Sequence, residues 1–205
     1  TAAAEVTTSF NVSKQNQTIS AFASVGTHAY GDIPFMVSLP VASSGLPMSV
    51  TVKSGPATIS GGSVSVTGVG TVVLAANQSG DTNYNAAAEV TTSFVVTQAA
   101  QSIGAFSAVG SKTYGDAAFS ILSPVSNSGL PVAVAVKSGP ATMNGGTITL
   151  TGAGTVVLSA NQAGNSNYTA AAEVTTSFNV SKQNQTISAF ASVGTHAYEI
   201  GRAHV

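Results

Sequence analysis

The sequence contains no cysteine, and only 6% of its residues are charged. The absence of cysteine excludes disulfides, thiolate catalysis and thiolate metal ligands. Charged residues usually make up about a quarter of a globular domain. The polar surface of this protein must therefore come from Ser, Thr, Asn and Gln.

Basic residues are also scarce, because the chain has six Lys and Arg residues in total and a net charge of −1. Without a basic patch, we expect no nucleic-acid partner and no attraction to anionic membrane surfaces. No run of 18 apolar residues is present, so we expect no membrane insertion within this sequence. Nothing in the composition indicates a cofactor.

What the sequence does contain is an internal repeat. Tyrosines at positions 30, 114 and 198 follow one another at intervals of 84 residues, and residues 1–30 recur unchanged as 169–198. This period is too long for one turn of a solenoid and is typical of one small domain. We expect the last strand of a truncated repeat over 1–14, complete repeats over 15–98 and 99–182, and the start of a truncated repeat over 183–198.

Both ends of the chain indicate a fragment. The chain begins at Thr1, within the repeat pattern and without an initiating Met or a signal peptide. After Tyr198 the expected Gly-Asp pair is replaced by residues 199–205, which contain the only Arg. This heptapeptide looks like the translation of a sequencing-library adapter, so we interpret it as a non-native tail. The alternative is a genuine divergent terminus.

Each repeat has the pattern of an all-β sandwich. Apolar and polar residues alternate in short runs, and turn residues separate the runs every 8–12 residues. Gly61-Gly62 predicts a tight hairpin turn, as does Asn144-Gly145 in the second copy. The predicted strands of the first repeat are 18–22, 35–39, 48–53, 57–60, 63–67, 71–77 and 90–96. The predicted inward residues are Phe35, Val37, Leu39, Val72, Leu74, Ala76, Val90, Thr92, Phe94 and Val96.

The differences between the copies agree with this inward face. Val64 becomes Ile148, which is the kind of apolar exchange that cores tolerate best. His28 becomes Lys112 at a position that we predict to lie on the surface. The junction over 96–103 contains no Gly or Pro and is short, so we expect tandem immunoglobulin-like sandwiches arranged end to end.

A set of short motifs recurs in fixed order. In the first copy it comprises Gln17-Thr18-Ile19, Thr27-His28-Ala29-Tyr30-Gly31-Asp32, Ser44-Gly45-Leu46-Pro47, Ser54-Gly55-Pro56-Ala57-Thr58, Gly68-Val69-Gly70-Thr71 and Asn83-Tyr84-Asn85-Ala86-Ala87. This set resembles the bacterial MBG-type repeat in its Tyr-Gly variety. The resemblance covers residues 1–198 and implies an extracellular or cell-surface location in large adhesin-like proteins. It transfers no catalytic or binding residue.

Candidate catalytic residues are few. His28 and His196 occupy equivalent positions, and the middle copy has Lys112 there, so a general base is not maintained at this position. No two carboxylates lie close in sequence, and we expect no catalytic residue and no enzyme activity. The carboxylates are Glu5, Asp32, Asp81, Glu89, Asp116, Glu173 and Glu199.

Calcium between repeats is the main metal hypothesis. Calcium requires six to eight oxygen ligands, usually including several carboxylates. The loop at Asp81 offers one carboxylate and its copy at Asn165 offers none, while Asp32 and Asp116 are single acids. We therefore expect no metal site and predict that these side chains bond to nearby backbone and shape turns.

The tyrosines Tyr30 and Tyr114 allow two interpretations. They could be exposed platforms for sugars, but we expect buried rings whose hydroxyls bond to the backbone. Asn-x-Ser/Thr triplets such as Asn16-Gln17-Thr18 and Asn184-Gln185-Thr186 are expected by chance in this composition.

Three functions remain open. The leading one is a stalk or spacer within a bacterial surface protein, built from neighbouring identical repeats. The second is a module that binds a surface glycan or protein weakly and gains avidity from the array. The third is an accessory module of a secreted enzyme whose catalytic domain lies elsewhere.

Overall fold

The computed structural model describes residues 1–195 and 198, and these residues form fourteen strands and no helix. The predicted all-β class is confirmed. The expected tail at 199–205 and the candidate His196 lie outside the described residues. The strands of the first sandwich are β1 (His28–Ala29), β2 (Phe35–Met36), β3 (Ser49–Ser54), β4 (Ala57–Ser60), β5 (Ser63–Val66), β6 (Gly70–Asn77) and β7 (Val90–Thr97).

The second sandwich repeats the first, strand for strand. In each repeat a four-stranded sheet faces a three-stranded sheet, with orders β1-β7-β6-β3 and β2-β5-β4 in the first. This is the arrangement of an immunoglobulin-like sandwich. The strands of the second sandwich are β8 (Lys112–Thr113), β9 (Phe119–Ser120), β10 (Ala133–Ser138), β11 (Ala141–Asn144), β12 (Thr147–Leu150), β13 (Gly154–Asn161) and β14 (Val174–Ser181).

The first segment of each repeat changes partner along its length. Ile19 forms a single antiparallel bridge with Ala42, which follows β2, and β1 then pairs parallel with β7. The predicted strand at 18–22 is therefore wrong beyond this one bridge. The change of partner leaves too few consecutive residues beside one segment to build a ladder.

The β4–β5 hairpin confirms the predicted turn at Gly61-Gly62, where both glycines have positive φ (56° and 84°). In the second repeat Asn144 pairs with Thr147, so the turn residues are Gly145 and Gly146. The predicted Asn144-Gly145 turn was thus displaced by one residue. Two consecutive left-handed residues are required in this turn, and glycine adopts that conformation without a steric penalty.

The core lies between the two sheets of each repeat. In the first repeat it contains Val37, Val64, Val72, Leu74, Phe94 and Val96, with Phe35 partly buried beside them. These positions confirm most of the predicted inward face. Leu39 was predicted inward but is 46% exposed, because β2 ends at Met36 and Leu39 turns outward over the β4–β5 hairpin.

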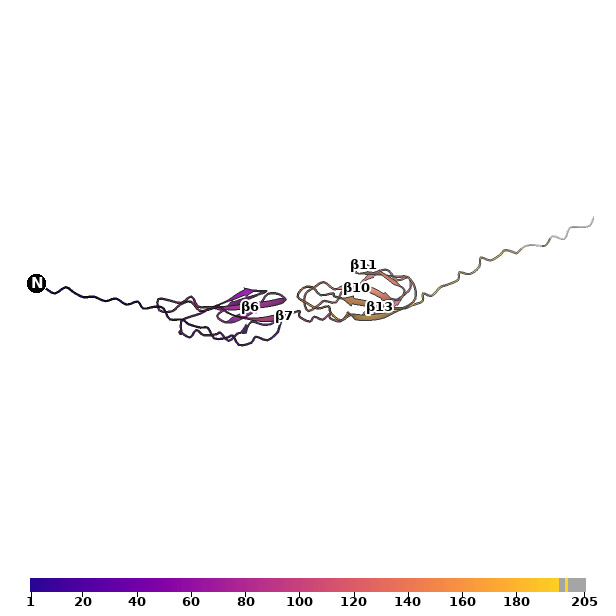
Figure 1. The fold of residues 1–205 in the computed structure, drawn as a ribbon. Coiled ribbons are helices and arrows are strands. Elements are labelled where there is room, and N and C mark those ends of the chain that lie inside the picture. Colours follow the sequence, from indigo (N-terminus) through magenta and orange to yellow (C-terminus); the bar gives the residue numbers. More distant parts are fainter. Residues whose placement is uncertain (196–197, 199–205) are drawn as a thin grey trace, which may run out of the picture.

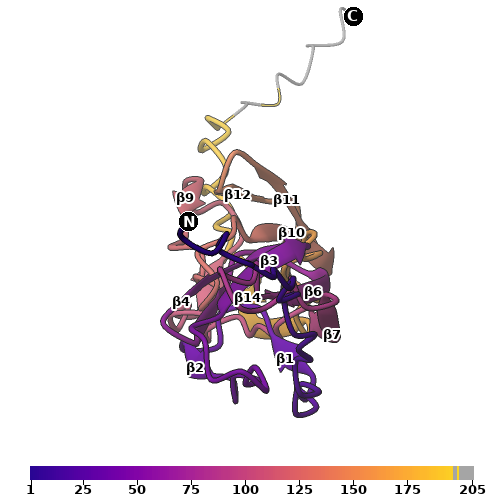
Figure 2. The ribbon, with the colours of Figure 1, turned by 60° about the vertical axis from the view of Figure 1, so that its left-hand side comes forward.

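The two sandwiches lie end to end, as Figure 1 shows, and Figure 2 views the same arrangement turned by 60°. The chain reaches the first repeat beside the loop of residues 78–85, where Gln15 bridges Tyr84. It leaves at the opposite end, where Tyr30 donates its backbone N–H to Thr97. We call these ends the N-terminal pole and the C-terminal pole of a repeat.

Candidate functional site

The position occupied by His28 and Lys112 lies at the rim of the core rather than on the open surface. The His28 ring stacks on Phe35 at 3.6 Å between centroids, with an interplanar angle of 7°. Lys112 places its Nζ 4.4 Å from the centroid of Phe119. Our prediction of a surface position is therefore corrected. Both side chains thus cover the ring of the equivalent phenylalanine, His28 by stacking and Lys112 by a cation–π contact.

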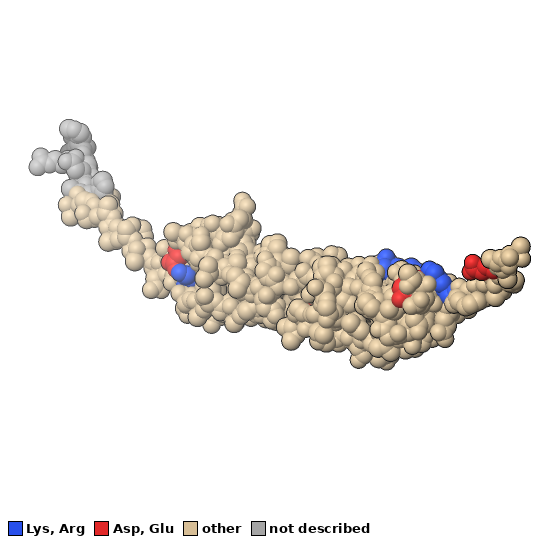
Figure 3. Space-filling model, turned by 90° about the vertical axis from the view of Figure 1, so that its left-hand side faces the viewer, with Lys and Arg blue, Asp and Glu red and all other residues tan. Residues whose placement is uncertain are grey.

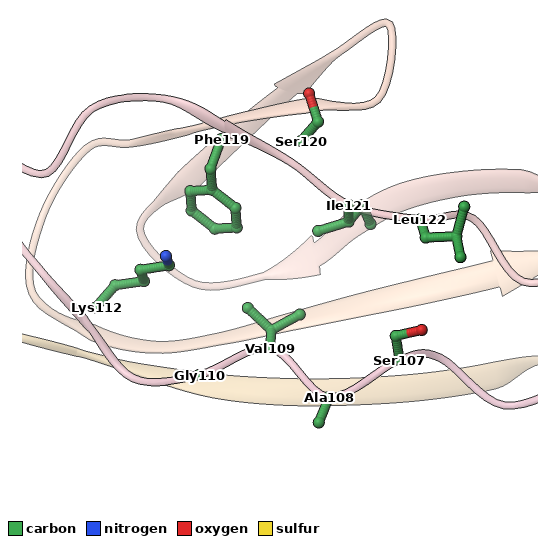
Figure 4. Close-up of a pocket in the computed structure, with 9 residues that line it drawn as sticks. All are labelled: Ser107, Ala108, Val109, Gly110, Lys112, Phe119, Ser120, Ile121 and Leu122. Carbon is green, nitrogen blue, oxygen red and sulfur yellow. The ribbon is translucent and has the colours of Figure 1, made fainter.

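A groove opens beside Lys112 in the second repeat (Figure 4). Its walls include Ser107, Val109 and Leu122, and its volume is about 230 Å³. Small-molecule sites usually measure about 300–1,000 Å³. The groove is thus too small for a typical ligand, and it contains no second charged side chain that would orient one.

The aspartates hold turns together. Oδ2 of Asp32 accepts the backbone N–H of Ala29 at 3.0 Å, and Asp116 accepts Thr113 N–H at 2.9 Å. The Ala29 N–H, followed by the His28 ring, lowers the pKa of Asp32. Each aspartate therefore already bonds to nearby backbone, as predicted.

Asp81 makes the same kind of turn at the other pole. Its Oδ1 accepts the backbone N–H groups of Asn83 and Tyr84, each at 2.8 Å. Asn165 accepts the equivalent two N–H groups in the second repeat. The turn thus requires an oxygen and not a charge. Within the described residues, no group of three or more His, Asp or Glu side chains is placed to hold a metal ion.

A buried glutamine network, which our sequence analysis missed, ties each N-terminal pole together. Gln17 donates its Nε2 to Gln78 Oε1 at 2.9 Å and to the carbonyl of Asn85 at 2.7 Å. Gln78 donates to the carbonyl of Pro47 at 3.1 Å, and Ser44 donates to Gln17. The network links three segments distant in sequence. Its only sequence signal was the recurrence of Gln at the same position in every copy.

The same bonds recur in the second repeat, where Gln101 and Gln162 take these roles. No buried side-chain nitrogen or oxygen atom among the described residues lacks a hydrogen-bond partner. A satisfied network of this kind stabilises a fold but offers no free group to a ligand.

One exposed polar cluster is also repeated. Lys53 Nζ contacts Glu89, which accepts a 3.3 Å bond from Asn77 Nδ2; Lys137, Glu173 and Asn161 repeat the arrangement. The bond from Lys53 lowers the pKa of Glu89, so the carboxylate is ionised at neutral pH.

Charged side chains elsewhere are sparse, as the mostly uncharged face in Figure 3 shows. Among the described residues, none belongs to a helix that is long and apolar enough to cross a bilayer.

The tyrosines differ from our prediction. Tyr114 is 45% exposed, and Tyr30 is partly buried against Tyr168 of the other repeat. Their rings meet edge to face, 5.4 Å apart at 87°. We predicted that each ring would be buried and would bond to backbone through its hydroxyl. The structure replaces that prediction with a contact between repeats for Tyr30 and with exposure for Tyr114.

Comparison with known proteins gives no family assignment. No family model matches the chain, and no curated protein matches it. Among solved structures it is similar to a fragment of mouse cadherin-23, at 12% identity and a TM-score of 0.33, over 82% of this chain and 64% of that one. The chain thus spans less than two thirds of the cadherin fragment.

Two further solved structures show similarly low identities and TM-scores. The immunoglobulin domains 1–4 of Sidekick-1 give 12% identity and a TM-score of 0.34, covering 82% of this chain and 49% of the other. A SusE-like surface polysaccharide-binding protein of Bacteroides thetaiotaomicron gives 14% and 0.30, covering 81% and 34%. These likenesses concern the fold alone.

Proposed function

We propose that this chain is a structural spacer, part of the stalk of a large bacterial surface or secreted adhesin-like protein. The observation that carries the proposal is the path of the chain. Each repeat is reached at one pole and left at the other, so every repeat adds its full length to the array (Figure 1). The proposal assigns the chain no enzyme activity.

The pairing of the first and last strands suits a part that is pulled from its ends. β1 lies parallel to β7, with His28 opposite Val96, and Thr97 Oγ1 donates to the carbonyl of His28. A force between the two poles slides these strands along each other. The bonds between them are then loaded together instead of opening one after another.

The resemblance to MBG-type repeats supports an extracellular location, and the neighbours that each repeat contacts are other repeats. The absence of cysteine is compatible with this role, because each core is built from two apolar sheets without a covalent link.

Force spectroscopy on the full chain, held by its two ends, tests the spacer proposal. We expect two unfolding events, each lengthening the chain by about 25–30 nm, since a repeat of 84 residues extends at up to ~3.6 Å per residue. A single event, or extension without a force peak, would contradict independent load-bearing repeats. The variant Phe94→Ala serves as a control, because it should lower the unfolding force of the first repeat and leave that of the second repeat unchanged.

A second candidate function is adhesion to a protein, favoured by an apolar patch on the first repeat. By patch we mean the exposed apolar side chains of residues 33–41, which are Ile33 (83% exposed), Met36 (70%), Val41 (67%) and Leu39 (46%). Met36 and Leu39 converge beside Gly62. Three of the four equivalent positions in the second repeat are Ala117, Ser120 and Ser123. A group of exposed apolar side chains without an aromatic ring suits an apolar protein face better than a sugar.

This candidate is tested by giving the first repeat the residues of the second. The triple change Ile33→Ala, Met36→Ser and Leu39→Ser should abolish capture of an immobilised extracellular protein panel by the full chain. Equal capture by the parent and the variant would remove the patch from consideration.

A further inference from the structure

The link between the two repeats is one residue long. At its first end, the carbonyl of Thr97 accepts the backbone N–H of Tyr30 at 2.9 Å. At its second end, Ala99 donates its N–H to Asn167 at 2.9 Å and accepts the N–H of Thr169 at 3.0 Å. Only Gln98 lies between these two anchored positions, so the backbone has very few torsions with which to bend.

The side chain of Gln98 is held as well. Its Nε2 donates to the carbonyl of Asn165 at 2.7 Å and lies 3.5 Å from the carbonyl of Tyr168. Both acceptors belong to the loop at the N-terminal pole of the second repeat. The linking residue is therefore hydrogen-bonded to the repeat that follows it.

Above the link, the two poles touch directly. The edge-to-face pair of Tyr30 and Tyr168 joins the C-terminal pole of the first repeat to the N-terminal pole of the second. A methyl group placed on Gly68 would lie 3.8 Å from Oδ1 of Asn167, so the β5–β6 loop reaches the same place. Aromatic pairs of this geometry favour one relative orientation.

We propose that Tyr30, Tyr168 and Gln98 form a stiff joint, in which the C-terminal pole of one repeat recognises the N-terminal loop of the next. The inference rests on the proposed spacer function and names the surface that would make the spacer stiff. The exposed Tyr114 is the same pole residue as Tyr30, seen without a following repeat.

The sequence itself supports a matched contact between link and loop. Position 98 is Gln where the loop has Asn165, whereas the equivalent link position before the first repeat is Lys14 and its loop has Asp81. A neutral link thus precedes a neutral loop residue, and a cationic link precedes an anionic one. The charges agree at both links, while the contact in the structure itself is from Gln98 to the backbone carbonyl of Asn165. Within the described residues, Lys14 and Asp81 form no ion pair.

Double electron–electron resonance, which measures the distance between two spin labels, tests the joint in the full chain. Because the chain has no cysteine, labels can be placed on Thr51→Cys and Ala135→Cys, which are equivalent exposed positions on β3 and β10. We expect a narrow distribution of label distances in the parent. Tyr168→Ala and Gln98→Gly should each broaden it about twofold, while Tyr168→Phe should keep it narrow.

The repeat supplies the controls. Tyr84→Ala and Tyr114→Ala remove the same side chains at the poles that have no neighbouring repeat, and these variants should leave the distribution unchanged. The joint is refuted by a broad parent distribution, by no broadening in Tyr168→Ala and Gln98→Gly, or by equal broadening in the controls. A broad distribution around a long mean distance refutes only the joint, whereas a short mean distance refutes the extended spacer itself.

Discussion

Two segments of this protein share one sequence and have opposite structures. Residues 6–13 are identical to β14, yet they form no strand. Phe10 is 86% exposed, while the equivalent Phe178 is 4% exposed. A related contrast in burial holds between the tail at 183–195 and the identical segment 15–27, since Ile187 is 93% exposed and Ile19 is 9% exposed. The strand is therefore decided by its partners across the sheet and the core, and not by the local sequence.

The largest expected effect is on the core. Phe178→Ala should destabilise the second repeat by about 3–5 kcal/mol, because it leaves a cavity between the sheets. Phe10→Ala, in the same sequence context, should change nothing. Urea unfolding of the full chain followed by circular dichroism separates the two, since Phe178→Ala should make the transition biphasic. A loss under about 1 kcal/mol would show that β14 does not face the core.

A smaller effect is expected where two glycines share a left-handed backbone but differ in surroundings. Gly139 has φ 102°, and a Cβ there would lie 2.2 Å from the carbonyl oxygen of Thr155; Gly129 has φ 75° with open space around it. Gly139→Ala should cost about 2–3 kcal/mol and Gly129→Ala about 1 kcal/mol. Equal shifts of the urea midpoint for the two variants would contradict the close approach of the backbone at Thr155 to Gly139.

The glutamine network gives the next comparison. Gln17→Ala should cost about 1–2 kcal/mol, because Gln78 and the Asn85 carbonyl lose a buried partner. Gln185→Ala, at the same position in the exposed tail, should have no effect. Amide hydrogen exchange offers a second readout, and faster exchange should be confined to the N-terminal pole of the first repeat. Uniform loss of protection would contradict a local role.

The smallest effect concerns pH. Hydrogen bonds from Lys53 and Lys137 lower the pKa of Glu89 and Glu173 below the ordinary 4.5. Groups with a lowered folded pKa stabilise the fold above that ordinary value, and the stabilisation is lost as the pH falls through the folded pKa. We expect a small, salt-sensitive loss of stability in both repeats below about pH 4.5. The loss should be smaller in a Glu89→Gln, Glu173→Gln variant, and Asp32, whose pKa is also lowered, should account for part of what is left in the first repeat. Glu5→Gln is the matched control.

The fold of each repeat could be predicted from the sequence more completely than the contacts that its side chains make. The period, the alternation and the glycine turns together imply a sandwich, because each constrains the backbone locally. Leu39 could not be placed, since its outward direction depends on where β2 ends. The contact of Tyr30 with Tyr168 and the glutamine network could not be predicted either, because they join residues 138 and 61 positions apart whose spacing carries no pattern.

Small-angle X-ray scattering from the full chain tests the central claim most directly. Two sandwiches lying end to end should give a pair-distance distribution with a second maximum or shoulder at roughly 35–40 Å, the length of one repeat with its loops. The position of this feature depends on the spacing of the two bodies, so the extended terminal segments affect it little. A single symmetric maximum, as from one compact particle of about 16 Å radius of gyration, would contradict the account.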